Sequence, residues 1–264
     1  MFDISIPFLP KHRKAWLVGG AVRDLLLGVQ PADLDIISSE NAAEYAQELA
    51  KNVNSKAIEL GKPPLNIHRV TAKGRIFDIT ELNGSSIKQD LIKRDFTINA
   101  LAWELPTGKL IDFSDGQSDL AQKSIRMVSK TIFQQDPIRL LRAFRLAGML
   151  SFQIEKETAI LIKKEAHLLK RVATERIQSE LFKILKFPNS TPTINAMDAS
   201  DLLQSIVPEV TELKKCRQNQ FHEFNAFTHT MMALFALENI LTRFDYILQL
   251  EENTNPNKNL IKQP

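Results

Sequence analysis

The sequence predicts an α+β protein in which a mixed region of strands and helices precedes a purely helical region. Up to Gln122, short apolar runs of strand length alternate with glycine turns and helical apolar stripes, which places both kinds of element around one sheet. After Gln122 the strand signals fade and apolar residues recur at helical spacing. The 264 residues suffice for one large or two small domains.

The mixed region divides into short elements separated by turn residues. Two hairpins are expected, because Lys73-Gly74 and residues 106–108 separate apolar runs of strand length. Strands are therefore predicted at 15–18, 34–37, 67–71, 75–80, 101–105 and 110–113. Helices are predicted at 21–27 before Gly28, at 42–52 with Ser39 as N-cap, and from Ile87 with Ser86 as cap.

The helical region begins at Asp136-Pro137, which we interpret as an N-cap followed by proline at the first helical position. This helix is expected to run towards Gly148. Further helices are predicted at 155–162, 174–185 and 225–241, with a boundary at 187–190. The polar tail at 251–264 is expected to fray.

A glycine turn and a pair of carboxylates carry the first chemical signal. Gly19 and Gly20 lie between a strand and a helix start, where exposed backbone N–H groups and the helix N-terminus suit a phosphate. Asp33 and Asp35 lie two apart in an apolar run and share a strand face. Two adjacent carboxylates favour a cation such as Mg²⁺ with phosphate oxygens. The pattern predicts phosphoryl or nucleotidyl transfer from a metal-bound triphosphate, with ordinary surface charge as the alternative.

Two further stretches can extend this site. Asp78, in a neighbouring predicted strand, can add a third carboxylate or be an edge-strand charge. Residues 93–101 (KRDFTINAL) bring two cations, an Asp, a Thr and an Asn together. Such groups can bind phosphate and ribose hydroxyls, although a helix cap explains them equally well.

Asp136 and Arg139 form a candidate base-reading pair. An acceptor-only carboxylate beside a donor-only guanidinium matches the edge of cytosine or adenine, and mispairs with uracil or guanine. A good bidentate pair discriminates by ~1–3 kcal/mol. The alternative is an i, i+3 ion pair worth ~0.2–0.5 kcal/mol.

Charge and composition suggest partners and a compartment. Residues 123–186 hold fourteen Lys or Arg against six Asp or Glu, which suits a polyanion or, alternatively, solvated helix faces. The single Cys216 fits a reducing compartment. No apolar run approaches the ~20 residues of a membrane span, and the charges at 11–14 follow the apolar residues, the wrong order for a signal peptide. We expect a cytoplasmic protein with no membrane partner.

The motifs together resemble a known family. Residues 19–24 (GGAVRD), Asp33-x-Asp35, 94–100 (RDFTINA) and 136–142 (DPIRLLR) occur in this order. They resemble the ordered motifs of the class II tRNA nucleotidyltransferases (CCA-adding enzymes) and bacterial poly(A) polymerases, and 174–181 resembles the motif that follows them. The resemblance covers residues 15–187. It implies a polymerase-β-like head at 1–127, a templating and RNA-binding neck at 128–187, and a helical body at 188–264.

The resemblance also implies an activity and its residues. The activity is growth of a tRNA or other RNA 3′ end from CTP and ATP. Asp33 and Asp35 would hold Mg²⁺ and act with Asp78 as the catalytic carboxylates. The implied nucleotide-binding residues, of which Asp136 and Arg139 read the base, are Gly19, Gly20, Arg23, Arg94, Asp95, Asn99, Asp136, Arg139 and Arg142.

The sequence departs from the family pattern in three places. Gln135 stands where the family usually has Glu. The span 81–89 is shorter than the flexible segment of members that complete CCA, which predicts a CC-adding subtype, although loop lengths also drift. Residues 220–230 resemble the opening of an HD-type phosphohydrolase domain without its completing His-Asp pair, so we expect His222 and His229 to be non-catalytic. A poly(A) polymerase and a non-catalytic RNA-binding remnant are the alternatives to tRNA extension.

Overall fold

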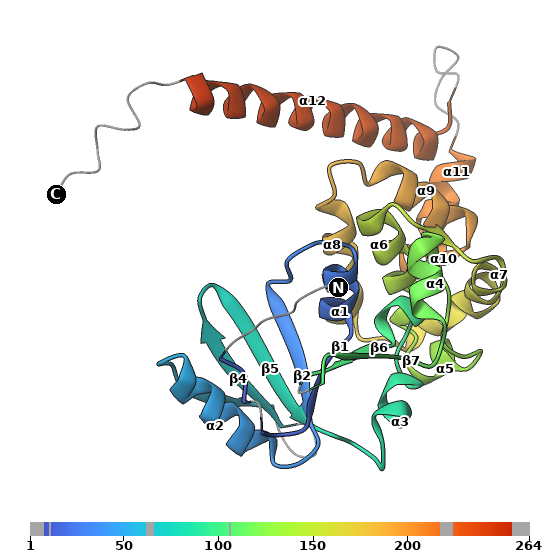
Figure 1. Ribbon diagram of the computed structural model, residues 1–264. Helices are drawn as coiled ribbons and strands as arrows, with labels where there is room; N and C mark the ends of the chain where they lie inside the picture. Colours follow the sequence, from blue (N-terminus) through green and yellow to red (C-terminus); the bar gives the residue numbers. More distant parts are fainter. Residues whose placement is uncertain (1–7, 11, 62–65, 106, 217–223, 255–264) are drawn as a thin grey trace. The chain divides into compact units, whose positions relative to one another are not determined.

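The computed structural model describes residues 8–10, 12–61, 66–105, 107–216 and 224–254, without the side chains of 245–254. Two compact units divide the chain (Figure 1). The first unit comprises Met1–Asp136 with Phe152–Thr158, and the second comprises Pro137–Ser151 with Ala159–Pro264. Among the described residues, all the strands lie in the first unit, together with short helices, and the second unit is helical, which confirms the predicted α+β class. The three predicted functional ranges, 1–127, 128–187 and 188–264, stay a prediction.

A seven-stranded sheet forms the centre of the first unit, in the order β3-β4-β5-β2-β1-β6-β7. Strands β2 and β5 run parallel, and the other neighbouring pairs in this sheet are antiparallel. The strands are β1 (Ala15–Val18), β2 (Asp33–Ser38), β3 (Ala57–Leu60), β4 (Ile67–Ala72), β5 (Arg75–Glu81), β6 (Leu101–Glu104) and β7 (Lys109–Asp112). All six predicted strands are confirmed. The sequence missed β3, a half-exposed edge strand without a clear apolar alternation.

The two faces of the sheet differ in burial. Leu34 and Ile36 of β2 and Phe77 of β5 are fully buried on one face. Helix α2 (Ala42–Asn52) lies against β2, β4 and β5 (Figure 1). Because successive residues of a strand alternate between faces, Asp33 and Asp35 emerge on the opposite, open face, and both are exposed.

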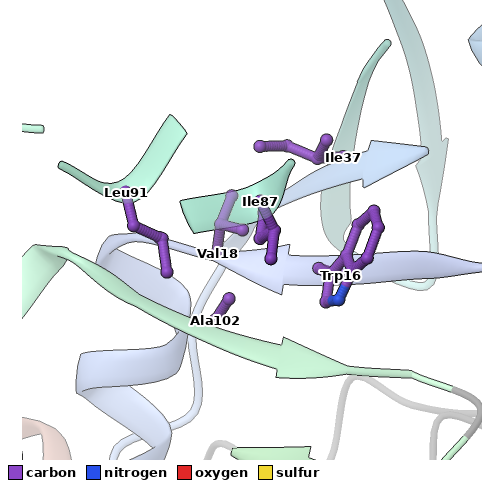
Figure 2. Packing of buried hydrophobic residues seen from close by; sticks show 6 residues of the cluster. All are labelled: Trp16, Val18, Ile37, Ile87, Leu91 and Ala102. Carbon is purple, nitrogen blue, oxygen red and sulfur yellow. The ribbon is translucent and has the colours of Figure 1, made fainter. Parts of the chain in front are cut away.

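An apolar cluster covers one end of that open face and fixes the strand that carries the carboxylates (Figure 2). Short helix α3 (Ile87–Leu91) contributes two members to this cluster and packs over the others. Its members are Trp16, Val18, Ile37, Ile87, Leu91 and Ala102. Ile37 follows Asp35 by two residues on the same face, and Val18 pairs opposite Asp35. Since each large apolar side chain contributes about 1.5–3 kcal/mol when fully buried, this packing holds β2 in register beside the carboxylates.

Two predicted helix caps differ in the structure. Asn41, rather than Ser39, caps α2: its side chain accepts a hydrogen bond from the backbone N–H of Glu44 at 3.1 Å. Asn41 adopts the left-handed conformation (φ 41°) that asparagine tolerates. The Ser39 hydroxyl instead donates to the carbonyl of Lys14. Ser86 occupies the N-cap position of α3 as predicted, but its side chain makes no capping bond.

The segment Thr97–Asn99 forms a short 3₁₀ helix, η1, that rests directly on another helix. Helix α4 (Gly116–Ala121) packs so closely that a Cβ at Gly116 would lie 2.3 Å from the carbonyl oxygen of Thr97. The Thr97 hydroxyl donates to Asp119, which also pairs with Arg126. Because both backbone contact and side-chain bonds converge there, the position of η1 is tightly defined.

Two short strands and one helix complete the first unit. Strand β8 (Ser124–Ile125) pairs in parallel with β9 (Gln153–Ile154), which the sequence did not predict because two-residue strands leave no periodicity. Helix α5 (Ile132–Gln135) ends at Asp136, whose backbone is extended. Asp136 is therefore not the N-cap of the following helix, because its N–H closes α5 on Ile132 and a residue before proline disfavours helical geometry.

The second unit is helical in its described part, and the predicted helices are confirmed. Helix α6 begins at Arg139, later than the sequence predicted. The helices are α6 (Arg139–Leu150), α7 (Lys156–Glu165), η2 (Ala166–Arg171), α8 (Thr174–Leu185), α9 (Thr191–Ala199), α10 (Leu202–Ile206), α11 (Val210–Lys215) and α12 (Ala226–Thr254). The prediction that 251–264 fray is wrong for 251–254, where α12 continues to Thr254, and residues 255–264 lie outside the described residues. No described helix is both long and apolar enough to cross a membrane.

Glu238 connects helix α12 to the start of α9 through hydrogen bonds. Its carboxylate, in a residue that is 8% exposed, accepts hydrogen bonds from the backbone N–H and hydroxyl groups of Ser190 and Thr191. Partial burial by itself raises the pKa of Glu238, but these hydrogen bonds outweigh it and leave the pKa below its ordinary value. The ionised carboxylate therefore supplies the acceptors that the first turn of α9 needs.

We expect Glu238→Gln to lower the free energy of unfolding at pH 7 by about 1–3 kcal/mol, because a charged acceptor of several donors is lost. The pKa of Glu238 is depressed in the folded chain, so its contribution is fully present above the ordinary value of 4.5 and is lost as pH falls through the folded value. Urea unfolding at pH 7 and pH 4 measures both. The exposed Glu209→Gln is the control, and equal losses for both variants at pH 7 would contradict the role of Glu238.

Candidate functional site

Three carboxylates share the open face of the sheet. Asp33 and Asp35 lie on β2. In the register of the parallel strands β2 and β5, Asp78 lies next to Asp35. The structure thus places Asp78 on the neighbouring strand, as the sequence predicts. Among the described residues, no group of three or more His, Cys, Asp or Glu side chains is arranged to hold a metal. The protein can therefore offer an incoming cation the Asp33–Asp35 pair, with further ligands from substrate or water.

Arg69 also lies on this face, although the sequence motifs did not predict it as a site residue. Arg69 of β4 pairs opposite Asp78, and its guanidinium donates from Nε and Nη2 to the two carboxylate oxygens, each at 2.7 Å. These bonds and the charges of Asp78, Asp33 and Asp35 raise the pKa of Arg69. The signal was present in the sequence, because a two-residue turn at Lys73-Gly74 places residue 69 opposite residue 78.

The glycine turn forms a cradle beside Asp35. Gly19 adopts φ 72° and ψ −138°, a conformation open to glycine alone, and its N–H donates to the carbonyl of Leu101. A Cβ at Gly19 would lie 2.7 Å from Arg94 Nη1 and 3.9 Å from Asp35 Oδ2. Gly20 begins α1 (Gly20–Leu26) directly afterwards. The turn, a cation and a carboxylate therefore meet at one point.

Arg94 reaches this point from the segment between α3 and η1. Its Nε and Nη2 donate to Asp90 Oδ2 at 3.0 and 2.9 Å. The remaining nitrogen, Nη1, is the one beside Gly19. Because Asp90 lies in α3, which the apolar cluster fixes to the sheet, the guanidinium is held in position beside the glycine turn.

A buried chain of hydrogen bonds connects helix α1, which follows the glycine turn, to the segment that contains Asp95 and Asn99. Arg23 of α1, 6% exposed, donates to Asp24 and, from Nη1, to Asn99 Oδ1 at 2.8 Å. Asn99 donates in turn to Asp95 at 3.0 Å, which also accepts from the N–H of Phe96. Asp95 and Asn99 are 5% and 8% exposed. This geometry favours positioning of Arg23 over the direct nucleotide contact that the sequence suggests for Asp95 and Asn99.

The remaining predicted site residues divide between the units. Asp136 belongs to the first unit, and Arg139 and Arg142 lie on α6 of the second. Arg142 lines a pocket of about 390 Å³ between α6 and α8, with Ile138, Glu175, Arg176, Ser179 and Glu180. Glu180 is buried there and accepts from Arg145 at 2.6 Å and Lys183 at 3.1 Å. His222 lies outside the described residues, and His229 lies on α12.

The donors on the open face fit a hard divalent cation that arrives with phosphate. Two exposed carboxylates supply oxygen ligands, which Mg²⁺ prefers, and leave coordination positions for phosphate oxygens and water. Arg94 and the glycine cradle lie next to Asp35, where phosphate charge needs donors. Together these groups have the chemistry that binding of a metal-bound triphosphate needs.

Comparisons with known proteins agree with this chemistry. The family "Poly A polymerase head domain" matches residues 15–126, and "Probable RNA and SrmB- binding site of polymerase A" matches 151–214. A CC-adding tRNA nucleotidyltransferase of Geobacter sulfurreducens is 38% identical, over 73% of this chain and 45% of the relative. An A-adding tRNA nucleotidyltransferase of Deinococcus radiodurans is 37% identical, over 90% and 55% respectively.

A solved structure shows the same fold. It is titled "The complex structure of CCA-adding enzyme with ATP", and it superposes with a TM-score of 0.71 at 31% identity, covering 92% of this chain and 56% of that one. This chain belongs to the family of tRNA nucleotidyltransferases and poly(A) polymerases. It spans about half the length of the curated relatives it matches.

We expect Gly19→Ala to destabilise the chain by about 1–3 kcal/mol, because the backbone conformation there is strained for any side chain. The added Cβ also displaces Arg94, so nucleoside triphosphate affinity falls. Gly74→Ala is the matched control, since Gly74 has the same φ of 72° but open space around its Cβ. Urea unfolding and calorimetric titration with CTP measure the two effects. A CTP affinity that falls equally in both variants would contradict the cradle.

Proposed function

We propose that this chain carries the catalytic part of a template-independent RNA nucleotidyltransferase that adds C, A or both to tRNA 3′ ends from CTP and ATP. The observation that carries the proposal is the convergence of Asp33, Asp35, Arg94 and the Gly19 turn on one open sheet face. Family membership supports it, as does the similarity to a CC-adding and an A-adding tRNA nucleotidyltransferase. A single exposed cysteine supports a cytoplasmic location.

The proposed chemistry is transfer of a nucleotide to an RNA hydroxyl. The 3′-oxygen forms a bond to the α-phosphorus of the triphosphate, the bond to pyrophosphate breaks, and the hydroxyl proton leaves to solvent. Nucleotidyltransferases of this family generally use a divalent metal. We propose Mg²⁺ held by Asp33 and Asp35, which when bound lowers the pKa of the hydroxyl and offsets the charge of the leaving pyrophosphate.

The remaining residues bind and orient. We propose that the N–H groups of the Gly19–Gly20 turn, Arg94 and Arg23 hold the triphosphate, and that Asp95 and Asn99 hold Arg23 through the buried hydrogen bonds. Asp78 adds a third carboxylate to the open face, next to Asp35. Because orientation and charge stabilisation suffice for phosphoryl transfer, no nucleophilic side chain is required.

Base choice is the second part of the proposal. We propose that Asp136 and Arg139 read the edge of cytosine or adenine, with Arg142 contacting the nucleotide beside them. The basic helices of residues 123–186 would bind the RNA. The short 81–89 connection, whose last residues begin helix α3, favours CC addition over complete CCA addition. Addition of A alone, poly(A) addition and RNA binding without turnover are the alternatives.

Extension of a tRNA that lacks CCA is the direct test. With CTP, ATP and Mg²⁺ present, sequencing of the 3′ ends reports which nucleotides are added and how many. Asp35→Asn should lower the rate by about a hundredfold or more, because a charged group that stabilises the transition state is lost. Its tRNA affinity should stay unchanged. Asp115→Asn, an exposed carboxylate of the same unit, is the control, and full activity in Asp35→Asn would refute the proposed site.

Arg139→Ala should relax base choice. Loss of a bidentate reader reduces discrimination by about 1–3 kcal/mol, so UTP and GTP should gain relative to CTP and ATP in single-nucleotide competition assays. Arg171→Ala removes an exposed cation from the same unit and should leave the preference as it is. An unchanged preference in Arg139→Ala would place base reading elsewhere in the chain.

A further inference from the structure

A buried carboxylate, Asp119 of α4, lies outside the groups that the proposed chemistry uses. The residue is 6% exposed, and its Oδ2 accepts hydrogen bonds from the Thr97 hydroxyl and from Arg126 Nε, the latter at 2.9 Å. Arg126 Nη2 pairs with the same oxygen at 2.8 Å. Because a buried charge without a partner is strongly destabilising, the carboxylate needs this cation. The bond from Thr97 is additional, and its consequence is to fix η1.

The two polar ends of η1 hold different partners. Thr97, which is fully buried, donates to Asp119 of α4, and Asn99 accepts from Arg23 Nη1 at 2.8 Å. A 3₁₀ helix of three residues is weakly stabilised by its own hydrogen bonds. Its position therefore depends on the groups around it. A shift of Thr97 relative to α4 reaches Arg23 through only two further residues of the chain.

The guanidinium of Arg23 lies directly beside the glycine turn. A Cβ at Gly20 would lie 3.4 Å from Nη2 and 3.7 Å from Cζ of Arg23. Nε and Nη2 pair with Asp24 at 2.8 and 2.7 Å, but Asp24 belongs to the same helix, so these bonds move with Arg23. The bond to Asn99, which is 76 positions away in the chain, relates the guanidinium to a separate part of the first unit.

The sheet holds α4 and the glycine turn at neighbouring positions. The carboxylate of Asp112 in β7 accepts from the backbone N–H groups of Gly116 and Gln117, at 3.0 and 2.9 Å, and so fixes the start of α4. Asp112 is the register partner of Leu101 in β6, whose carbonyl accepts from the N–H of Gly19 at 3.2 Å. The bonds that run through η1 therefore close a ring between two elements that the sheet already fixes.

We propose that Thr97 and Asp119 are positioning residues for Arg23: their hydrogen bond fixes η1, so that Asn99 holds the guanidinium beside the glycine turn in the orientation that receives a triphosphate. Orientation matters because a guanidinium presents its donors in a rigid planar fork, and a rotated fork loses its bonds to phosphate. The inference rests on the proposed function, which supplies the triphosphate. It extends that function to two buried residues that reach the guanidinium through η1.

Thr97→Val tests the proposal, because it removes the hydroxyl, nearly keeps the shape of the side chain and leaves the pair of Asp119 with Arg126 in place. In the full chain, solvent exchange of the Arg23 Nε–H, followed by NMR, should accelerate about tenfold or more, because Asn99 no longer holds the guanidinium. CTP affinity, measured by calorimetric titration with Mg²⁺ present, should fall about tenfold. Thr97→Ser keeps the hydroxyl and should stay within about twofold of the parent in both measurements.

Thr191→Val is the matched control. Thr191 is 7% exposed and its hydroxyl also donates to a carboxylate, that of Glu238 at 2.7 Å, but it belongs to the second unit. The control should lower the urea midpoint about as much as Thr97→Val does, because each variant loses a buried hydrogen bond to a charged group. It should change neither Arg23 exchange nor CTP affinity. The Arg23 signal is the one that is absent from the spectrum of Arg23→Lys.

Several results would overturn the inference. These are unchanged Arg23 exchange in Thr97→Val, an equal acceleration in Thr191→Val, no recovery in Thr97→Ser, or unchanged CTP affinity in Thr97→Val when the parent chain binds CTP. The exchange measurement needs neither nucleotide nor RNA. A chain in which Arg23 exchange responds as expected, but which binds no CTP and extends no tRNA, would refute the proposed function and leave the positioning of Arg23 in place.

Discussion

The position of the candidate site depends on the register of β2, because one face of this strand packs into the core and the other carries the carboxylates. Leu34 and Ile36 pack into the buried core, while Asp33 and Asp35 emerge on the open face. A shift of one residue would bury both carboxylates and expose the apolar side chains. Packing on both faces prevents this, because the same open face that carries the carboxylates ends in the apolar cluster beneath α3 (Figure 2).

Motifs that are far apart in the chain become one connected structure around the glycine turn. The conformation of Gly19 admits Arg94 next to Asp35. The buried bonds from Arg23 through Asn99 to Asp95 tie the first helix to the segment before η1. Because Gly116 has no side chain, helix α4 packs directly against the backbone of η1. Each motif thus needs the others in place, which explains why a single motif is weak evidence of function and the ordered set is strong.

Charge is distributed differently in the two units. On the open face of the first unit, Asp78 is paired with Arg69 and Asp35 lies beside Arg94, which suits a cation brought in with phosphate. In the second unit, Arg145 and Lys183 surround the buried Glu180, and Arg142 and Arg176 line the adjacent pocket. An acidic face and a basic helical region fit the proposed reaction between a metal-bound triphosphate and an RNA end.

The sequence alone determined six of the strands and most of the longer helices, the hairpin turn at Lys73-Gly74 and the placement of Asp78 beside β2, because local periodicity and turn chemistry encode them. Only the tertiary structure decided the capping role of Asn41, the end of α5 at Asp136, and the burial of Asp95 and Asn99. It also showed that Asp78 is bound by Arg69. The physical reason is that hydrogen-bond partners and burial depend on which distant strands and helices come together, and a linear pattern carries that information only where a turn sets the register.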